Sequence, residues 1–364
     1  MHRGLRRFSS AVSSLPSVLQ ARSTDIHFNL ATESFFIEAL KRQTPTLFLW
    51  RNAKTIVIGR HQNAWKECDV KQMEGDGVKL ARRYSGGGAV YQDHGNTCFT
   101  FLGPASSFSK ERNNALLLEV LREDFGIRGE VSGRNDLIDS EGKRKFSGAA
   151  YRHLGDFSLH HGTVLMDVDM QGLSRYLTPN KLKLQSKGVQ SVASRVVNLK
   201  NLNKEICHHS LCEALTRRFL SHAPDVPEDQ KRVLVLEEAS VPFGQDPLFL
   251  THLQRMRDWN WAFGASPSFS HCLEGRVKLG TFEVNMQVEE GLVKDVRVFS
   301  DCLYPDLVEE LERTLRSARY SGESLKGAVG GLGDWGGREG KMEDQDWKMC
   351  IEELGEWLYN ETVG

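Results

Sequence analysis

Hydrophobic and polar residues alternate along the chain with two different periods, and these periods predict its secondary structure. Apolar residues at every third or fourth position predict helices, which we place at 29–42, 112–125, 170–177 and 205–221. Short apolar runs rich in β-branched and aromatic residues predict strands, which we place at 47–50, 55–59, 97–101, 134–139, 144–150 and 162–168. We therefore expect both helices and strands in the main part of the chain.

Prolines gather between residues 224 and 248 and predict a boundary between two domains; they are Pro224, Pro227, Pro242 and Pro247. We expect a larger domain at 26–245 and a smaller one at 246–364. The smaller domain should contain a helix at 248–257, alternating strands within 275–299 and helices at 304–317 and 343–360. The Gly-rich segment 327–340 is expected to be a loose loop.

Composition narrows the class of protein. The chain has 364 residues, of which 40% are hydrophobic, so it can bury a full core. Its net charge of −1 gives no basic surface for nucleic acid, and no apolar run reaches the roughly 18 residues that cross a membrane. We therefore expect neither nucleic acid nor a membrane as a partner.

The N-terminal segment 1–25 has a composition of its own. It contains Arg3, Arg6, Arg7 and Arg22 and many serines, with no Asp or Glu before residue 25. Arg-rich, Ser-rich and acid-poor segments are typical of organelle transit peptides, whereas a secretory signal would need a longer apolar centre. The alternative is a basic tail without a targeting role.

The seven cysteines are an odd number and form no C-x-x-C pair; they are Cys68, Cys98, Cys207, Cys212, Cys272, Cys302 and Cys350. We expect most of them to pack as small hydrophobic residues in a reducing compartment. The group Cys207, His208, His209 and Cys212 resembles a metal site, but it falls on a predicted amphipathic helix, which favours a structural role.

The most informative segment is Arg82–Asn96, which contains Gly86, Gly87 and Gly88. Successive backbone N–H groups in such a turn can form a concave anion site, and Arg82 and Arg83 are suited to phosphate contact. A flexible surface turn is the alternative. The segment lacks the Gly-Lys-Ser/Thr of a Walker loop and the G-x-G-x-x-G of a dinucleotide fold, and strand-forming residues follow it.

Three further segments carry candidate chemistry. Polar residues 59–63 follow a predicted buried strand, where they either face a ligand or form an ordinary turn. Lys145 precedes small residues and could span a carboxylate and an α-phosphate, unless 133–151 is a solvated hairpin, as we expect for Lys143. Asp136 could hold Mg²⁺ or pair with a cation. His160 and His161 should point to opposite faces of a strand, so that one of them faces a pocket.

Together these segments resemble the lipoate–protein ligase A family, which includes mitochondrial lipoyltransferases. The resemblance covers the chain after residue 25 and rests on 47–67, 82–101, 132–137, 145–151, 160–165, 185–198 and 259–270. It implies an α+β fold, with a biotinyl/lipoyl protein ligase-like catalytic domain that has a mixed β-sheet and flanking helices, and with a small α/β C-terminal accessory domain. It also implies that lipoate and MgATP form lipoyl-AMP, whose lipoyl group passes to a lysine of an apo-lipoyl domain.

The resemblance assigns roles to individual residues. Arg83 would contact the nucleotide, Lys145 both lipoate and ATP, and Asn135 and Asp136 the phosphates and metal. The nucleotide or lipoate would be lined by Gly86, Gly87, Gly88, Ala89, Val90, Tyr91 and His161. Gln92 departs from the family pattern, which usually has His there, so no acid–base role is expected at that position.

The resemblance leaves several functional alternatives open. The expected acceptors are the E2 subunits of 2-oxoacid dehydrogenases and the glycine cleavage H protein, in the mitochondrial matrix, with the enzyme as a monomer. The chain could instead catalyse only the transfer step, or be an inactive cofactor-binding scaffold. An octanoyltransferase would need a catalytic cysteine, and Cys98 alone stands near the motifs.

Overall fold

The computed structural model describes residues 17–39, 45–177, 185–186, 195–222, 226–334 and 343–363. The chain divides into two compact units. Unit 1 comprises Met1–Arg60, Lys79–Ser174 and Ser191–Asp258; unit 2 comprises His61–Val78, Arg175–Gln190 and Trp259–Gly364. Two short segments of the N-terminal half therefore belong to unit 2.

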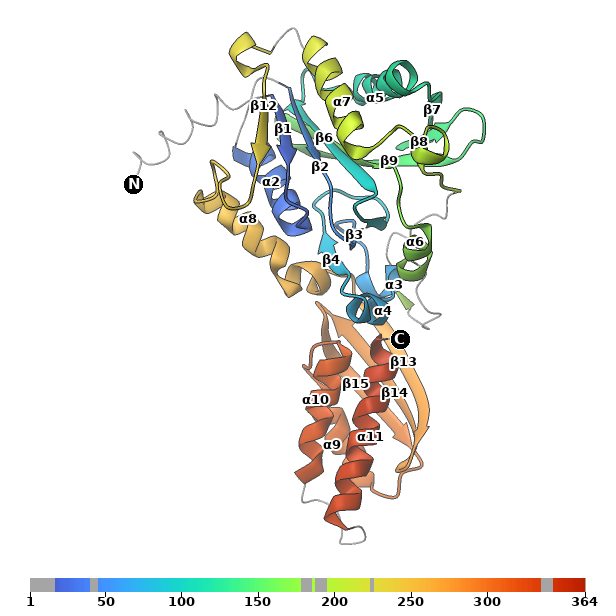
Figure 1. Ribbon diagram of the computed structural model, residues 1–364. Coiled ribbons are helices and arrows are strands. Elements are labelled where there is room, and N and C mark those ends of the chain that lie inside the picture. The colour runs from blue at the N-terminus through green and yellow to red at the C-terminus, as the bar shows by residue number, and fades with distance from the viewer. Residues whose placement is uncertain are drawn as a thin grey trace, which may run out of the picture. The chain divides into compact units, whose positions relative to one another are not determined.

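Unit 1 is built on a mixed eight-stranded sheet (Figure 1), as the α+β expectation requires. Its strands, in sheet order, are β12 (Val233–Leu236), β1 (Val18–Ala21), β2 (Thr46–Trp50), β6 (Asn96–Pro104), β10 (Phe157–Leu165), β9 (Lys145–Leu154), β8 (Asp136–Asp139) and β7 (Gly129–Ser132). Strand β1 pairs in parallel with both of its neighbours, and the other pairs are antiparallel.

Strand β1 lies within the segment 1–25 that the sequence analysis expected to be a leader. Val18 and Leu19 are completely buried, and β1 is hydrogen-bonded between β2 and β12. A leader that ended at residue 25 would take a paired strand out of this sheet. The extent of a leader stays a prediction, and residues 1–16 lie outside the described residues.

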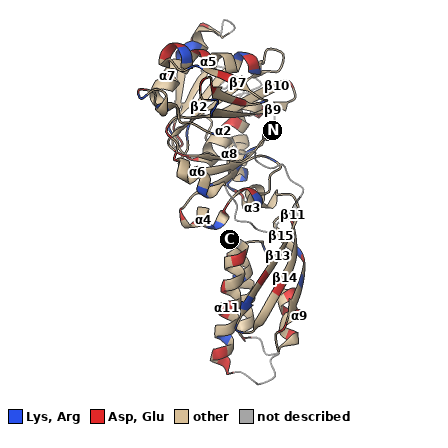
Figure 2. Ribbon diagram, turned by 90° about the vertical axis from the view of Figure 1, so that its right-hand side faces the viewer, with Lys and Arg blue, Asp and Glu red and all other residues tan. Residues whose placement is uncertain are grey.

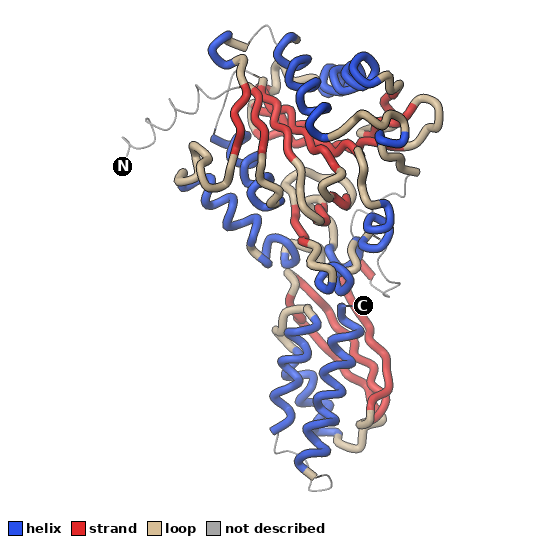
Figure 3. Tube along the Cα trace, viewed as in Figure 1, coloured by secondary structure: helices blue, strands red, loops and turns tan. Residues whose placement is uncertain are grey.

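Helices cover both faces of the large sheet (Figure 3). On one face, α5 (Lys110–Phe125) and α7 (His208–Ser221) pack over the main hydrophobic core, which includes Phe99, Phe146 and Leu215. Ser109 caps the N-terminus of α5, and Gly126, with a φ of 67°, ends it. On the other face lie α2 (Ile26–Ala39) and α8 (Pro247–Arg257).

Helix α8 departs from the expected domain boundary at 245/246. It packs against α2 and belongs to unit 1, which extends to Asp258. Phe249 and Phe243 pack on Phe35 of α2, with ring centroids 6.0 and 4.7 Å away. The prolines between 224 and 248 thus mark turns inside unit 1 rather than the start of unit 2.

A small three-stranded sheet in unit 1 carries the Gly-rich segment. Its strands, in sheet order, are β4 (Lys79–Arg82), β3 (Thr55–Ile58) and β5 (Val90–Gln92). The short helices that follow β3 and β10 in the chain are α3 (Ala64–Glu67), α4 (Val70–Gly75) and α6 (Met170–Tyr176).

Unit 2 combines a four-stranded sheet with helices. The sheet order is β11 (Gln185–Ser186), β13 (Phe269–Val277), β14 (Gly280–Glu289) and β15 (Leu292–Ser300). The helices are α9 (Pro305–Leu315), α10 (Gly322–Gly330) and α11 (Asp344–Val363), and acidic residues recur along α11 (Figure 2). Helix α10 overlaps the segment expected to be a loop, because Ser321 caps it and Leu325 and Val329 are buried.

All seven cysteines are free thiols, and Cys68, Cys98, Cys212 and Cys350 are buried. In the segment that resembled a metal site, Cys207 caps α7, the ring of His208 hydrogen-bonds to Thr97 and His209 pairs with Glu213. Among the described helices, none is long and apolar enough to cross a membrane.

Candidate functional site

The glycine turn, Gly86–Gly88, lies between β4 and β5 and presents free backbone donors. Within the described part of the chain, the N–H groups of these three glycines donate to no other residue. Gly87 has a φ of 90°, a left-handed conformation that favours glycine. Three adjacent unused donors on an exposed turn have the arrangement that an anion site requires, and anion binding by this turn stays a prediction.

The Arg83 side chain binds the backbone carbonyl groups of this turn. Its Nη2 donates to the carbonyl oxygens of Gly86 and Gly88, both at 2.7 Å, and its Nη1 donates to Val57 O at 3.0 Å. Burial lowers the pKa of the Arg83 guanidinium to about 10, and the Glu33 carboxylate opposes this shift. By binding the carbonyls, Arg83 leaves the N–H groups of the turn facing outward; its contact with a nucleotide stays a prediction.

The residues after β3 support the same turn. A Cβ atom on Gly59 would lie 2.3 Å from Gly87 O, so only glycine fits at this position. The buried Arg82 donates from Nη1 to the carbonyl oxygens of Gly59 and Arg60, both at 3.2 Å. Asn63 is an ordinary turn residue, because its side chain caps α3 by accepting from Trp65 N at 3.0 Å.

Lys145 and Asp136 form an ion pair between strands β9 and β8. Lys145 Nζ lies 2.9 Å from Asp136 Oδ1, and each side chain is 25% exposed. A Cβ atom on Gly148 would lie 2.9 Å from Lys145 Nζ, so the ammonium group lies directly over Gly148. Lys143 instead pairs with Glu130 on the surface, as expected.

Asn135 stabilises the turn before β8. Its Nδ2 donates to Ala149 O at 2.9 Å, and its own carbonyl oxygen accepts from Ala149 N at 2.8 Å. The residue is exposed and borders Asp136, so a role beside a phosphate stays a prediction.

Strand register brings these groups onto one face of the large sheet. Asp136 is paired with Gly148, and Ala150 with His161. Side chains two residues apart on β9 share a face, so Gly148 and Ala150 point the same way. A Cβ atom on Gly87 would be 3.8 Å from Ala150 Cβ, which places the glycine turn over this face.

The two adjacent histidines of β10 point to opposite faces, which confirms the prediction. His160 packs between Phe99 and Tyr151, with ring centroids 5.4 and 4.5 Å away. Burial lowers its pKa to about 3. His161 faces the other way, where its ring lies between Ser85 and Glu33.

Glu33 is a site residue that the sequence analysis missed. Its carboxylate, 3% exposed, accepts from the Thr100 hydroxyl and contacts His161 Nδ1 at 3.0 Å. A signal was present, because Glu33 is an acidic residue just before the apolar run Phe35–Ile37 in a helix that is buried on nearly every side. Charged residues in such helices are rarely buried unless they are paired, which makes them candidates for function.

The segment after the glycine turn is more structural than expected. The Tyr91 ring is buried and lies 3.0 Å from where a Cβ of Gly172 would be, so Tyr91 packs against α6. Ala89 and Val90 are partly exposed next to the turn. The Gln92 side chain accepts a hydrogen bond from the Asn52 side chain inside the fold, consistent with no acid–base role at this position.

An apolar wall continues from the polar groups along the same sheet face. Phe48 and Trp50 are stacked with ring centroids 6.0 Å apart, and both are buried. Trp50 Nε1 donates to Thr100 Oγ1 at 3.0 Å. These aromatic side chains belong to the packed interior on the same sheet face as Thr100.

The residues fit a nucleotide better than a metal held by protein alone. Among the described residues, no group of three or more His, Cys, Asp and Glu side chains could hold a metal ion. Asp136 is a single carboxylate, and magnesium is commonly held by one carboxylate together with substrate phosphates. Asp136 would suffice in that arrangement.

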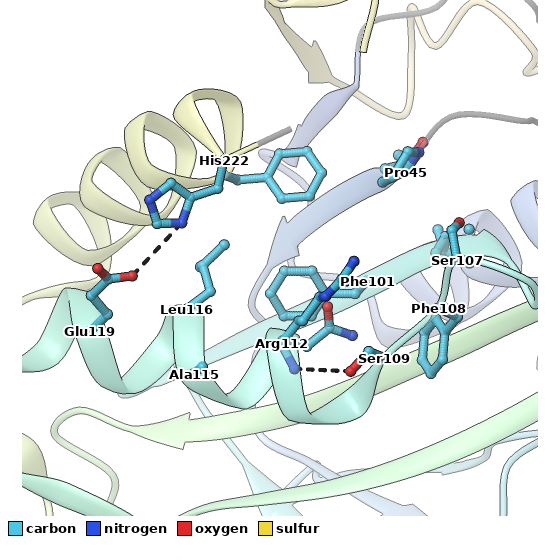
Figure 4. A pocket seen from close by; sticks show the side chains of 15 residues that line it. Pro45, Phe101, Ser107, Phe108, Ser109, Arg112, Ala115, Leu116, Glu119 and His222 are labelled. Atoms are coloured by element: carbon cyan, nitrogen blue, oxygen red, sulfur yellow. Dashed lines mark hydrogen bonds and ion pairs between the residues drawn. The ribbon is translucent and has the colours of Figure 1, made fainter. Parts of the chain in front are cut away.

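A separate cavity of about 530 Å³ lies on the opposite face of the sheet (Figure 4). It is bordered by Phe101, Arg112 and Leu116, and by His222 and Glu119, whose side chains are 3.7 Å apart. None of the residues predicted for nucleotide or lipoate binding lines it.

Comparisons with known proteins identify the family of the chain. The lipoyl protein ligase A/B catalytic domain matches residues 25–220, and the bacterial lipoate protein ligase C-terminus matches residues 266–337. Lipoate-protein ligase A of Psychrobacter cryohalolentis is 38% identical over 348 residues, which are 95% of this chain and 99% of that protein. Lipoate-protein ligase A of Blochmanniella floridana is 41% identical over 301 residues, 82% of this chain and 87% of that protein.

Solved structures of lipoate-protein ligases are similar to this chain. P. falciparum LipL1 in complex with lipoate has a TM-score of 0.60 and 32% identity, covering 95% of this chain and 99% of that one. A lipoate-protein ligase A bound with ATP has a TM-score of 0.54 at 22% identity, covering 69% of this chain and 99% of that one, which supports the fold alone. The chain belongs to the lipoate–protein ligase A family and is an enzyme of that class.

Proposed function

We propose that this enzyme attaches lipoate to a lysine of apo-lipoyl domains through lipoyl-AMP. The acceptors would be the E2 subunits of 2-oxoacid dehydrogenases and the glycine cleavage H protein. The observation that carries the proposal is the shared sheet face, where the Lys145 ammonium and the free N–H groups of the glycine turn both lie over strand β9.

The activation step needs two anions to meet. A carboxylate oxygen of lipoate attacks the α-phosphorus of ATP, the bond to the β-phosphate oxygen breaks, and pyrophosphate leaves. The Lys145 ammonium reduces the repulsion between carboxylate and phosphate, and the glycine turn can donate to phosphate oxygens. Mg²⁺, shared between Asp136 and the phosphates, would neutralise further charge.

The transfer step needs less from the protein. The acceptor lysine nitrogen attacks the carbonyl carbon of lipoyl-AMP, the bond to the phosphate oxygen breaks, and AMP leaves while the nitrogen loses a proton. Since the adenylate is already activated, positioning of the two reactants supplies most of the rate enhancement.

The experiment is a reconstitution with purified protein, lipoate, MgATP and an apo-lipoyl domain, followed by mass spectrometry of the acceptor. We expect lipoylation, and a loss of about 100-fold or more for Lys145→Ala, because that variant removes the cation between the reacting anions. Lys143→Ala is the matched control, since Lys143 pairs with Glu130 on the surface.

A second reaction, in which synthetic lipoyl-AMP replaces lipoate and ATP, distinguishes the alternatives. Product formed only when synthetic lipoyl-AMP replaces lipoate and ATP would show a transfer-only enzyme. No product under either condition would support the inactive scaffold and overturn the proposal.

Localisation in the mitochondrial matrix is part of the same proposal. It is supported by Arg3, Arg6 and Arg7 in a segment without acidic residues. Deletion of residues 1–16 should therefore abolish import in cells, and import that persists without them would contradict this role.

A further inference from the structure

The cavity on the opposite face of the large sheet lies outside the candidate site (Figure 4). Its volume of about 530 Å³ falls within the range of small-molecule sites, about 300–1,000 Å³. Thr100 and Phe101 are neighbours on β6, so their side chains point to opposite faces. The Thr100 hydroxyl donates to Glu33 at the candidate site, whereas Phe101 borders the cavity. The sheet therefore separates the cavity from the candidate site.

Apolar side chains form the inner wall of this cavity. Phe101 of β6, Leu116 of α5 and Phe219 of α7 all border it, and the ring centroids of Phe101 and Phe219 lie 6.2 Å apart. All three residues are buried and belong to the main hydrophobic core. A ligand in the cavity would contact the edge of this core between α5 and α7, which favours an apolar body.

One face of α5 gives the cavity two chemically different ends. Arg112, Leu116 and Glu119 border the cavity and are spaced by four and three positions, so they share one face of the helix. The helical rise separates Arg112 and Glu119 by about 10 Å along the axis. The cavity therefore extends from a cation, past an apolar side chain, to a carboxylate.

The two charged ends differ in their partners. Glu119 Oε1 lies 2.7 Å from Arg218 Nη1, and Glu119 Oε2 lies 3.7 Å from His222 Nδ1. The Arg112 guanidinium pairs with no carboxylate in the part of the chain that the structure describes, and only its backbone N–H has a hydrogen bond, to Ser109 Oγ. Arg112 is also exposed, so a ligand can reach it from solvent. A guanidinium in this position is suited to binding a carboxylate through two N–H groups.

We propose that this cavity is a second ligand site, which binds free aliphatic monocarboxylates of medium chain length. The carboxylate pairs with Arg112, and the hydrocarbon chain lies along Leu116 against Phe101 and Phe219. The end bordered by Glu119 excludes a second carboxylate, because two like charges would meet there with little water between them.

The test uses the full-length enzyme and decanoic acid that carries a photoreactive diazirine on its chain. After irradiation, mass spectrometry should find the label on the peptides that contain Leu116 or Phe219. We expect this labelling to fall about fivefold or more in Arg112→Ala and to recover in part in Arg112→Lys, which keeps the charge. Arg122→Ala is the matched control, because Arg122 lies on the same helix, pairs with Glu123 and is not among the described residues that border the cavity.

Unlabelled competitors test the apolar wall and the charged ends separately. Hexanoate should compete less well than decanoate, because each buried methylene strengthens binding by up to about fourfold. Decanol and decanedioate should each compete about fivefold or more less well than decanoate. The alcohol lacks the carboxylate for Arg112, and the diacid brings a second carboxylate to the end bordered by Glu119.

Lipoylation assays distinguish this site from the candidate site. Lys145→Ala should lose ATP-dependent lipoylation and keep the label, whereas Arg112→Ala should keep lipoylation, so the two proposals can fail independently. Label absent from the peptides that contain Leu116 and Phe219 would overturn the proposal. Equal labelling of the wild type and Arg112→Ala, or equal competition by decanol and decanoate, would also overturn it.

Discussion

At the residue scale, Gly59 and Arg83 determine the shape of the glycine turn from two sides. Gly59 leaves room for the carbonyl of Gly87, and Arg83 binds the carbonyls of Gly86 and Gly88. With the carbonyls of Gly86 and Gly88 bound by Arg83, the N–H groups of the three glycines stay without a partner among the described residues. The permanent charge of Arg83 is buried close to Glu33, and Ser85 and His161 connect the two charged groups.

Replacing Gly59 with alanine tests this packing. The added Cβ would lie 2.3 Å from the backbone oxygen of Gly87. Because neither atom can move without its backbone, the turn must shift. We expect a loss of about 1–3 kcal/mol in the free energy of unfolding, the usual cost of overpacking, and weaker ATP binding. Urea unfolding and isothermal titration with ATP provide the measurements.

The stability control for this change is Gly86→Ala. Its Cβ would meet nothing within 4 Å and its φ is not in the left-handed region, so unfolding should change little. Equal destabilisation by both substitutions would show that the close approach of Gly59 to Gly87 is unimportant.

At the element scale, the folding of unit 1 depends on strand β1, which lies inside its large sheet. It fills the position between β12 and β2, and its loss would leave both of those strands without a partner on that side. Val18 and Leu19 are fully buried, and each contributes roughly 1.5–3 kcal/mol of hydrophobic stabilisation.

Two N-terminal deletions separate targeting from folding. A chain that begins at Ser17 should unfold at the same temperature as the full chain, because β1 is complete. A chain that begins at Ile26 should be insoluble or should lack a cooperative thermal transition. Cooperative unfolding of the shorter chain at the wild-type temperature would show that β1 is dispensable.

Elements were predictable where the local pattern agrees with the tertiary environment. The runs Thr46–Trp50 and Thr55–Ile58 are buried along their whole length, and their apolar sequence shows it. The strand Val18–Ala21 was missed because it is short and follows an Arg- and Ser-rich segment. Its burial depends on pairing with Val233–Leu236, which lies more than two hundred residues away, and no local pattern encodes such a pairing.

The sequence predicted the glycine turn and the charged residues of the candidate site, but not which side chains contact one another there. The glycine turn and Lys145 have distinctive local sequence. Glu33 joins the site only because α2 lies across β6 and β10, which brings its carboxylate to His161. Ser85 gains its partners in the same way, through a contact between residues 76 positions apart.

At the scale of the whole molecule, buried imidazoles in both units make stability depend on pH. Burial lowers the pKa of His160 to about 3 and of His208 to about 4 in unit 1. In unit 2, burial lowers the pKa of His271 to about 4. An unfolded histidine has a pKa of about 6.5, so as the pH falls the unfolded chain binds these protons first.

The sign of the effect follows from proton binding. The stability contributed by these neutral rings is fully present above about pH 6.5. It declines as the pH falls to about 4 for His208 and His271 and to about 3 for His160, with a slope of at most about 1.4 kcal/mol per pH unit for each histidine. We expect urea midpoints to fall between about pH 7.5 and about pH 5. His271→Gln should flatten this dependence for unit 2, since glutamine keeps an acceptor for the Tyr320 hydroxyl that His271 Nδ1 contacts but cannot take up a proton. His209→Gln is the control because that side chain is 83% exposed. An unchanged pH slope in His271→Gln would mean that burial of this ring does not govern the acid sensitivity of unit 2.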